Sequence, residues 1–134
     1  MDEAQITVIE QLRIKDPLLD QQILHQSSDF AYHGFLAAEA KHAARMSELR
    51  AKVVTAQLKE EARTTLAKAS EWSVNAYVES NPQFREVWEN CYRLQLQADL
   101  MTIAKDAFTQ RKDMLMSRAS DLRSERRGEM KVNG

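Results

Sequence analysis

The stretch Pro82–Arg127, PQFREVWENCYRLQLQADLMTIAKDAFTQRKDMLMSRASDLRSERR, decides the fold. Apolar or small residues recur in it at alternating intervals of three and four, which predicts one long amphipathic helix over 82–127. The series is Phe84, Val87, Cys91, Leu94, Ala98, Met101, Lys105, Phe108, Lys112, Leu115, Ala119 and Leu122. The two lysines can lay their methylenes along such a seam while the charge stays in water. Residues 128–134 are polar and are expected to fray.

Upstream of this stretch, the same spacing predicts a second long helix over 17–66. Asp16 is expected to cap it and Pro17 to occupy its first position. Its seam comprises Leu19, Ile23, Phe30, Ala37, Ala40, Ala44, Ala51, Val54 and Leu58, and a neighbouring row comprises Tyr32, Leu36, Ala43, Met46 and Val53. Short helices are predicted over 3–14 and 70–80, and Asn81 is expected to cap the last helix.

The composition and the element lengths together predict an all-α fold with a single domain over 1–134. Only 3 glycines and 2 prolines are present, too few for the turns of a sandwich or barrel. Two long helices of nearly equal length, joined by a short reversal, are expected to pack as an antiparallel hairpin with short accessory helices. Such a thin hairpin cannot bury both apolar flanks alone, so a homo-oligomer is expected.

The charged residues are distributed in alternating zones. Residues 1–39 carry 2 basic and 7 acidic side chains, and residues 40–70 carry 7 and 3. Residues 71–110 carry 3 and 6, and residues 111–134 carry 7 and 4. Folding back near residue 74 would set each basic zone against an acidic one, so part of the pattern is expected to be satisfied inside the chain.

Catalytic arrangements are not recognisable in the sequence, and an enzyme is not expected. Cys91 is the only cysteine, and no glycine-rich loop is present to hold phosphate. Glu39 and His42 have the Glu-x-x-His spacing of di-iron bundles, but a second such motif is missing, so neither metal nor cofactor is expected. A metal enzyme assembled at a subunit interface remains a distant alternative. The acidic start and the lack of a long apolar run predict a cytoplasmic protein without membrane contact.

A basic run is the strongest candidate for a binding site. It comprises Lys41, Arg45, Arg50, Lys52, Lys59, Arg63 and Lys68. Intervals of 7, 7 and 4 place Arg45, Lys52, Lys59 and Arg63 in one stripe along the helix, which could follow a phosphate backbone. Trp72 and Tyr77 follow the run and could stack on unpaired bases. The alternatives are a solvated charged face, and Trp72 as a core residue of the reversal. A second basic group near the C-terminus (Arg118, Arg123, Arg126, Arg127 and Lys131) is also explained by the helix dipole.

The order of these features resembles the UvsY-type recombination mediators of tailed phages over residues 18–127. The likeness begins with Leu18-Leu19-Asp20 and the aromatic residues Phe30 and Tyr32. It continues through Met46-Ser47-Glu48-Leu49-Arg50-Ala51-Lys52, then Ser70-Glu71-Trp72 and the break at Ser80-Asn81-Pro82. It ends with Lys105-Asp106-Ala107-Phe108 and Arg111-Lys112-Asp113-Met114-Leu115. It is a similarity of layout and residue type.

This resemblance implies a ring of several subunits that binds single-stranded DNA without sequence preference. Such a protein displaces the single-strand-binding protein and loads a RecA-like recombinase in DNA recombination and repair. The DNA-binding region would include Arg45, Arg50, Lys52, Lys59 and Arg63. The apolar last helix would serve oligomerisation, through Trp88, Leu94, Met101, Phe108 and Leu115. The slightly negative net charge departs from that of a dedicated DNA binder. The alternative function is a structural or adaptor coiled-coil protein of phage assembly that binds a protein partner.

Overall fold

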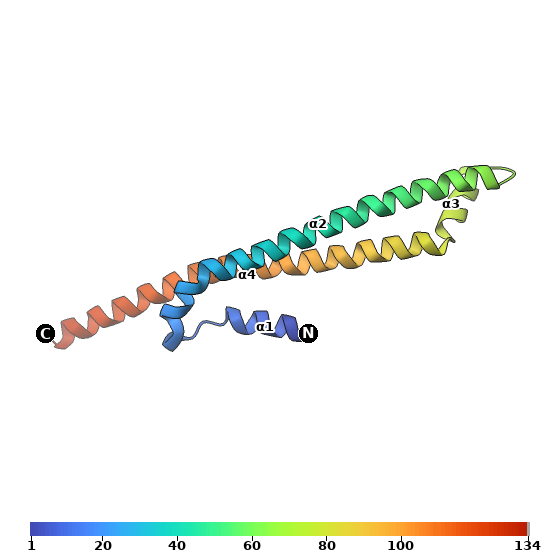
Figure 1. Cartoon of the computed structure of the whole chain (residues 1–134). Coiled ribbons are helices and arrows are strands. Elements are labelled where there is room, and N and C mark those ends of the chain that lie inside the picture. The colour runs from blue at the N-terminus through green and yellow to red at the C-terminus, as the bar shows by residue number, and fades with distance from the viewer. Residues whose placement is uncertain (134) are drawn as a thin grey trace. The chain divides into compact units, whose positions relative to one another are not determined.

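The computed structural model describes residues 1–133, and the burial of side chains for residues 1–129. Its elements in chain order are α1 (Glu3–Leu12), the short 3-10 helix η1 (Asp16–Leu18), α2 (Leu19–Thr65), α3 (Glu71–Glu79) and α4 (Pro82–Asn133) (Figure 1). No strand occurs within residues 1–133, and α2 packs against α4, as the sequence predicts for an all-α fold.

The chain divides into two compact units, which are described separately. The hairpin unit comprises residues 37–100, and the terminal unit comprises residues 1–36 together with the chain from residue 101 onward. Both long helices contribute to both units, because α2 and α4 each run through the division without a break.

The hairpin unit has a core made by three helices. Ala51, Val54 and Leu58 of α2, Val78 of α3, and Val87 and Cys91 of α4 form one buried cluster, with Phe84 and Trp88 packed against it. Trp88 donates a hydrogen bond from Nε1 to the hydroxyl of Thr55 at 3.0 Å, which ties α4 to α2. Within this unit the start of α4 therefore lies beside the second half of α2, as the predicted reversal requires.

Side-chain caps start the helices on either side of the reversal. Ser70 Oγ accepts a hydrogen bond from the backbone N–H of Ser73 at the start of α3. Asn81 Oδ1 accepts one from the N–H of Gln83 at 2.8 Å, and Pro82 is the first residue of α4. The predicted role of Asn81 is thus confirmed.

The terminal unit is built around two fully buried side chains of α4. Phe108 and Leu115 are 0% and 1% exposed, and the ring of His33 on α2 stacks on Phe108 at a centroid distance of 4.3 Å. Leu19, at the start of α2, is also buried in this unit.

Most predicted helix ends lie within two residues of those observed, and two predictions about helix ends fail for a physical reason. Asp16 does not cap a helix through its side chain: it is the first residue of η1, and its carboxylate binds Arg118 of α4 instead. The guanidinium group of Arg118 offers the carboxylate two parallel hydrogen bonds and a full positive charge, whereas a cap offers only uncharged backbone N–H donors, which explains the preference. At the other end, α4 continues to Asn133, whereas a frayed tail was expected from residue 128. The helix-forming residues around Gly128 outweigh its single penalty. Gly134 lies outside the described residues.

Candidate nucleic-acid interface on helix α2

The predicted basic residues of α2 lie on two different faces of the helix. At about 100° per residue, five of them fall within an arc of about 40°. These five, Lys41, Arg45, Lys52, Lys59 and Arg63, are called the α2 basic face. Arg50 lies roughly opposite this arc, and Lys68 follows the end of α2 in the connection to α3. All five residues of the basic face belong to the hairpin unit.

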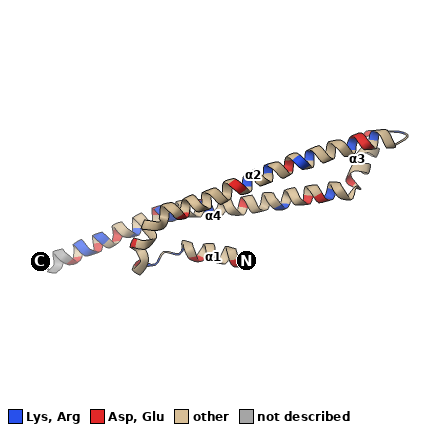
Figure 2. Ribbon diagram, in the orientation of Figure 1, with Lys and Arg blue, Asp and Glu red and all other residues tan. Residues whose placement is uncertain are grey.

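The α2 basic face is open to solvent. Four of its five residues are exposed, and Lys59 is half-buried. The buried residues of the same helix segment, such as Ala51 and Leu58, are rotated by about 100° about the helix axis from the cations. The basic face is therefore a flank of α2 that the packing against α4 leaves uncovered. Figure 2 marks the basic residues along α2 in blue.

Among the side chains described (residues 1–129), the basic face forms ion pairs only within α2, and these are weak. Lys52 Nζ lies 3.3 Å from Glu48, and Arg63 lies 3.7 Å from Glu60. All four side chains are more than half exposed, so each pair contributes at most about 0.5 kcal/mol to the free energy of folding. Among residues 1–129, Lys41, Arg45 and Lys59 form no ion pair. Phosphate oxygens can replace the two carboxylates at little cost.

The predicted matching of charged zones holds in one unit only. In the terminal unit, Arg111 pairs with Asp29 and Arg118 with Asp16, as the alternation of charges suggested. In the hairpin unit, no ion pair of the described residues joins the basic run of α2 to the acidic start of α4. The charge of the α2 basic face therefore stays available for a partner.

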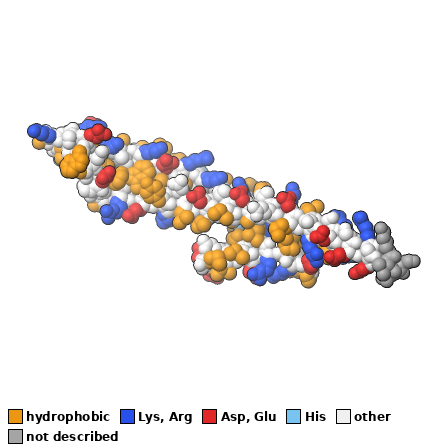
Figure 3. All heavy atoms as spheres, turned by 180° about the vertical axis from the view of Figure 1, so that it is seen from behind, with side chains coloured by type: hydrophobic (Ala, Val, Ile, Leu, Met, Phe, Trp, Pro, Cys, Tyr) orange, Lys and Arg blue, Asp and Glu red, His pale blue; other side chains and the backbone are white. Residues whose placement is uncertain are grey.

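A row of exposed apolar side chains borders the α2 basic face. Met46, Leu49 and Val53 are 52%, 55% and 48% exposed, and helical spacing places them beside the cations. We call these three residues the outer apolar row. On the face of the molecule drawn in Figure 3, hydrophobic and basic side chains lie side by side. Large side chains of this kind, grouped on one face, are typical of a contact surface.

The two aromatic residues that follow the basic run have different environments. Trp72, in the first turn of α3, is 81% exposed, so it is not the core residue of the reversal. Tyr77 is half-buried near α2, and burial, followed by the hydrogen bond and negative charge of Glu61, raises its pKa above the ordinary value. Only Trp72 is free to stack on a base.

The residues predicted for oligomerisation are divided between core and surface. Phe108 and Leu115 are buried in the core of the terminal unit, and Trp88, Leu94 and Met101 are half-buried. The exposed apolar residues of α4 in the hairpin unit are others: Tyr92, Leu96 and Leu100, at 63%, 59% and 42%. They lie on the side of α4 away from Val87 and Cys91, because helical spacing places the two sets on opposite faces.

A buried polar cluster in the terminal unit was not predicted from the sequence. Arg111 is 3% exposed and lies over the ring of Phe108 at 4.7 Å from its centroid. It donates hydrogen bonds to Gln26 Oε1 at 2.7 Å, to Asp29 Oδ2 at 2.8 Å and to the carbonyl oxygen of Gln11. Gln26 in turn donates to the carbonyl oxygen of Phe108. Every polar group of this cluster has a partner, which is typical of a structural element.

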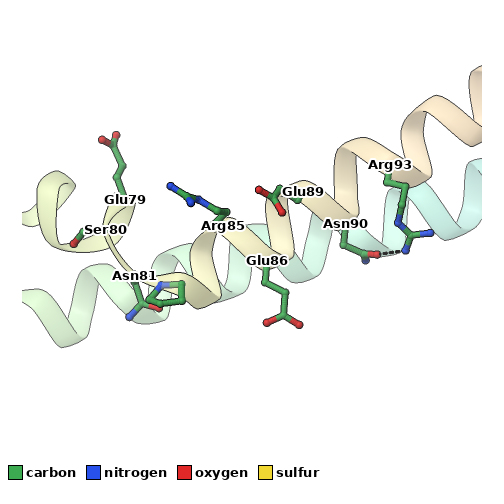
Figure 4. Close-up of a pocket in the computed structure, with 9 residues that line it drawn as sticks. Glu79, Ser80, Asn81, Arg85, Glu86, Glu89, Asn90 and Arg93 are labelled. Atoms are coloured by element: carbon green, nitrogen blue, oxygen red, sulfur yellow. Dashed lines mark hydrogen bonds between the residues drawn. The ribbon is translucent and has the colours of Figure 1, made fainter.

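A shallow depression of about 500 Å³ lies at the start of α4. Figure 4 shows its lining, in which Arg85 and Arg93 lie among acidic residues and Asn90 accepts a hydrogen bond from Arg93. The acidic members are Glu79, Glu86 and Glu89. Since the carboxylates outnumber the guanidinium groups, this depression is a poor site for phosphate.

Among the described residues, no group of three or more His, Cys, Asp or Glu side chains is arranged to hold a metal ion. None of the helices in the described part of the chain has both the length and the apolar composition that a bilayer span requires. Comparison with known protein families, with curated proteins and with solved structures finds no match to this chain.

Proposed function

We propose that this protein binds single-stranded DNA along the α2 basic face and acts as a recombination mediator that helps to load a RecA-like recombinase. The observation that carries the proposal is the alignment of five cations on one flank of α2, which form no ion pair outside their own helix among the side chains that the structure describes. The mediator role rests further on the resemblance to the UvsY-type proteins described above.

Five aligned cations can follow a flexible phosphate backbone without reading its sequence. Residues 41 and 63 are about 33 Å apart along the helix at 1.5 Å per residue. Binding to phosphates alone gives strong salt dependence, since each contact releases counterions. Trp72 adds a face for base stacking, which favours unpaired strands because paired bases are already stacked.

Oligomerisation is part of the proposal. Tyr92, Leu96 and Leu100 on the outward side of α4 form an apolar surface suited to contact with other copies. Joining several α2 basic faces along one strand would raise the affinity far above that of a single chain.

Fluorescence anisotropy of a labelled single strand of about 30 nucleotides, titrated with protein over a series of salt concentrations, tests this function. Five phosphate contacts per chain predict a slope of about −3.5 in log affinity against log salt for a single strand. A matched duplex is expected to bind more weakly. If the single strand does not bind at low salt, the proposal fails, and the adaptor function through the exposed apolar surfaces takes its place.

A further inference from the structure

Helix α1 presents an acidic and apolar face to solvent. No residue of α1 is buried, and its two isoleucines, Ile6 and Ile9, are 51% and 45% exposed. Helical spacing groups the two isoleucines with Asp2, Glu3 and Glu10 on one side of α1. The helix itself contains no Lys or Arg. This outward face therefore combines apolar contact with negative charge.

The opposite side of α1 is attached to the rest of the terminal unit. Gln5, Val8 and Leu12 are half-buried, and Arg111 donates a hydrogen bond to the carbonyl oxygen of Gln11. Immediately after α1, Gln22 of α2 donates to the carbonyl oxygen of Arg13 at 2.7 Å and accepts from the N–H of Lys15 at 3.1 Å. These contacts fix the end of α1, so its outward face is presented without any rearrangement.

The surface that complements this face is on α2. The outer apolar row of Met46, Leu49 and Val53 is exposed, as Ile6 and Ile9 are. The cations of the α2 basic face border that row on one side, as the carboxylates border the isoleucines on α1. Both the apolar and the charged parts of the two surfaces therefore match. Their charges are opposed only by exposed ion pairs along their own segments, Glu10 with Arg13 beside α1, and Lys52 with Glu48 and Arg63 with Glu60 on α2. Such exposed pairs are weak and can be exchanged for a new partner.

We infer that α1 of one copy docks on the α2 basic face and outer apolar row of a second copy, where it competes with nucleic acid. The competition rests on the proposed function, whereas the docking itself does not. A single ten-residue helix buries less than the roughly 1,200 Å² of a stable interface, so the contact is weak and displaceable. Single-stranded DNA, with a denser negative charge, displaces α1 at low salt, and the protein exchanges one acidic partner for another.

Disulfide trapping between two copies tests the docking. One full-length variant carries Ile6→Cys and a second, larger tagged variant carries Val53→Cys; the two are mixed and oxidised. The native Cys91 is buried and should not react. A cross-linked species containing one chain of each kind is expected. The control pair combines Ile6→Cys with Ser124→Cys, an exposed position on α4, and should give little of this product.

Two results of the trapping overturn the inference. One is a mixed product no more abundant than that of the control pair. The other is a cross-link that forms only within a single chain when both cysteines are on the same molecule. If the mixed product forms but the protein does not bind DNA, the docking of α1 is supported and the proposed function is contradicted.

The competition is tested by DNA affinity in the variant Ile6→Ser with Ile9→Ser. If α1 covers half to nine-tenths of the α2 basic faces, freeing them raises the apparent affinity about two- to tenfold. Both side chains are about half exposed, so the variant should keep its fold, which circular dichroism checks. Saturating single strand should also reduce the mixed cross-link. An unchanged affinity, or a cross-link insensitive to DNA, contradicts the competition.

Discussion

Arg118 of α4 holds the carboxylate of Asp16 through two parallel hydrogen bonds, from Nε to Oδ1 at 2.9 Å and from a terminal nitrogen to Oδ2 at 2.7 Å. Arg118 is also 3.7 Å from Glu125 on its own helix. The pair joins η1, which immediately precedes α2, to the later part of α4, within the terminal unit. Its strength depends on the ionised form of Asp16, so it makes this contact sensitive to acid.

The first prediction is that Asp16→Asn removes part of the acid sensitivity of folding. The hydrogen bonds from Arg118 hold the pKa of Asp16 below its ordinary value of 3.8. A lowered folded-state pKa gives stability that is present above the unfolded value and is lost as the pH falls through the folded one. The melting temperature of the variant should therefore lie below that of the wild type near neutral pH and converge with it in acid. A gap that persists unchanged in acid would show that the ion pair is not its cause.

The second prediction concerns the buried guanidinium group of Arg111. Replacing it by Met leaves Gln26 and the carbonyl oxygen of Gln11 without a donor and Asp29 without its cation. Because Asp29 is 41% exposed and can be rehydrated, the free energy of unfolding should fall by about 2–3 kcal/mol, measured by urea titration. The adjacent Lys112→Met is the matched control and should change it by less than about 0.5 kcal/mol. Equal effects at the two positions would contradict the assignment of Arg111 as a structural anchor.

Arg111 and Lys112 show how far the heptad pattern of α4 predicts which side chains are buried. The heptad series correctly placed Val87, Cys91, Phe108 and Leu115 in the core. It also placed Lys112 in the seam, whereas the structure buries Arg111 and exposes Lys112. A straight helix has 3.6 residues per turn, so a strict heptad drifts by about 20° per repeat. The partners of Arg111 are more than 80 positions away in the sequence, so the spacing along α4 could not reveal them.

The candidate site was predictable to a similar extent. The intervals along α2 placed Lys52, Lys59 and Arg63 on one face, and the structure agrees. Whether that face was solvent-exposed could not be predicted, because exposure depends on which side of α2 packs against α4. The separation of Arg50 from the other cations follows from helical spacing alone, whereas the exposure of Trp72 depends on tertiary packing and could not be predicted.

The third prediction is a loss of stability in mildly acidic solution through His33. Burial lowers the pKa of His33 from 6.5; nearby Asp29 opposes this shift and Arg111 adds to it. A histidine whose folded-state pKa is lowered stabilises the fold above its unfolded pKa, and this contribution is lost as the pH falls below 6.5 through the folded value. His33→Gln should flatten the dependence of the urea midpoint on pH in that range. A midpoint that falls equally in both proteins would assign the effect to another group.

The fourth prediction separates the two tryptophans by fluorescence. Trp72 is 81% exposed, whereas Trp88 is half-buried and donates a hydrogen bond to Thr55. In the variant Trp88→Phe, the remaining emission should be that of an exposed indole, and single-stranded DNA should quench it by stacking. Trp72→Ala should weaken DNA binding by about 1–3 kcal/mol without lowering the melting temperature. Binding without quenching of Trp72 would show that the strand does not reach α3.

The fifth prediction assigns DNA binding to one flank of α2. Lys52→Ala combined with Lys59→Ala removes two cations of the α2 basic face, so the slope of log affinity against log salt should become shallower by about 1.4 for each chain. Arg50→Ala combined with Arg93→Ala removes two exposed cations outside that face and serves as the matched control for net charge. It should leave the slope nearly unchanged. Equal losses in both variants would mean that the strand responds to the total charge of the protein. A loss confined to Lys52 and Lys59 would place the phosphates on the α2 basic face, because the two variants lose the same net charge at different positions.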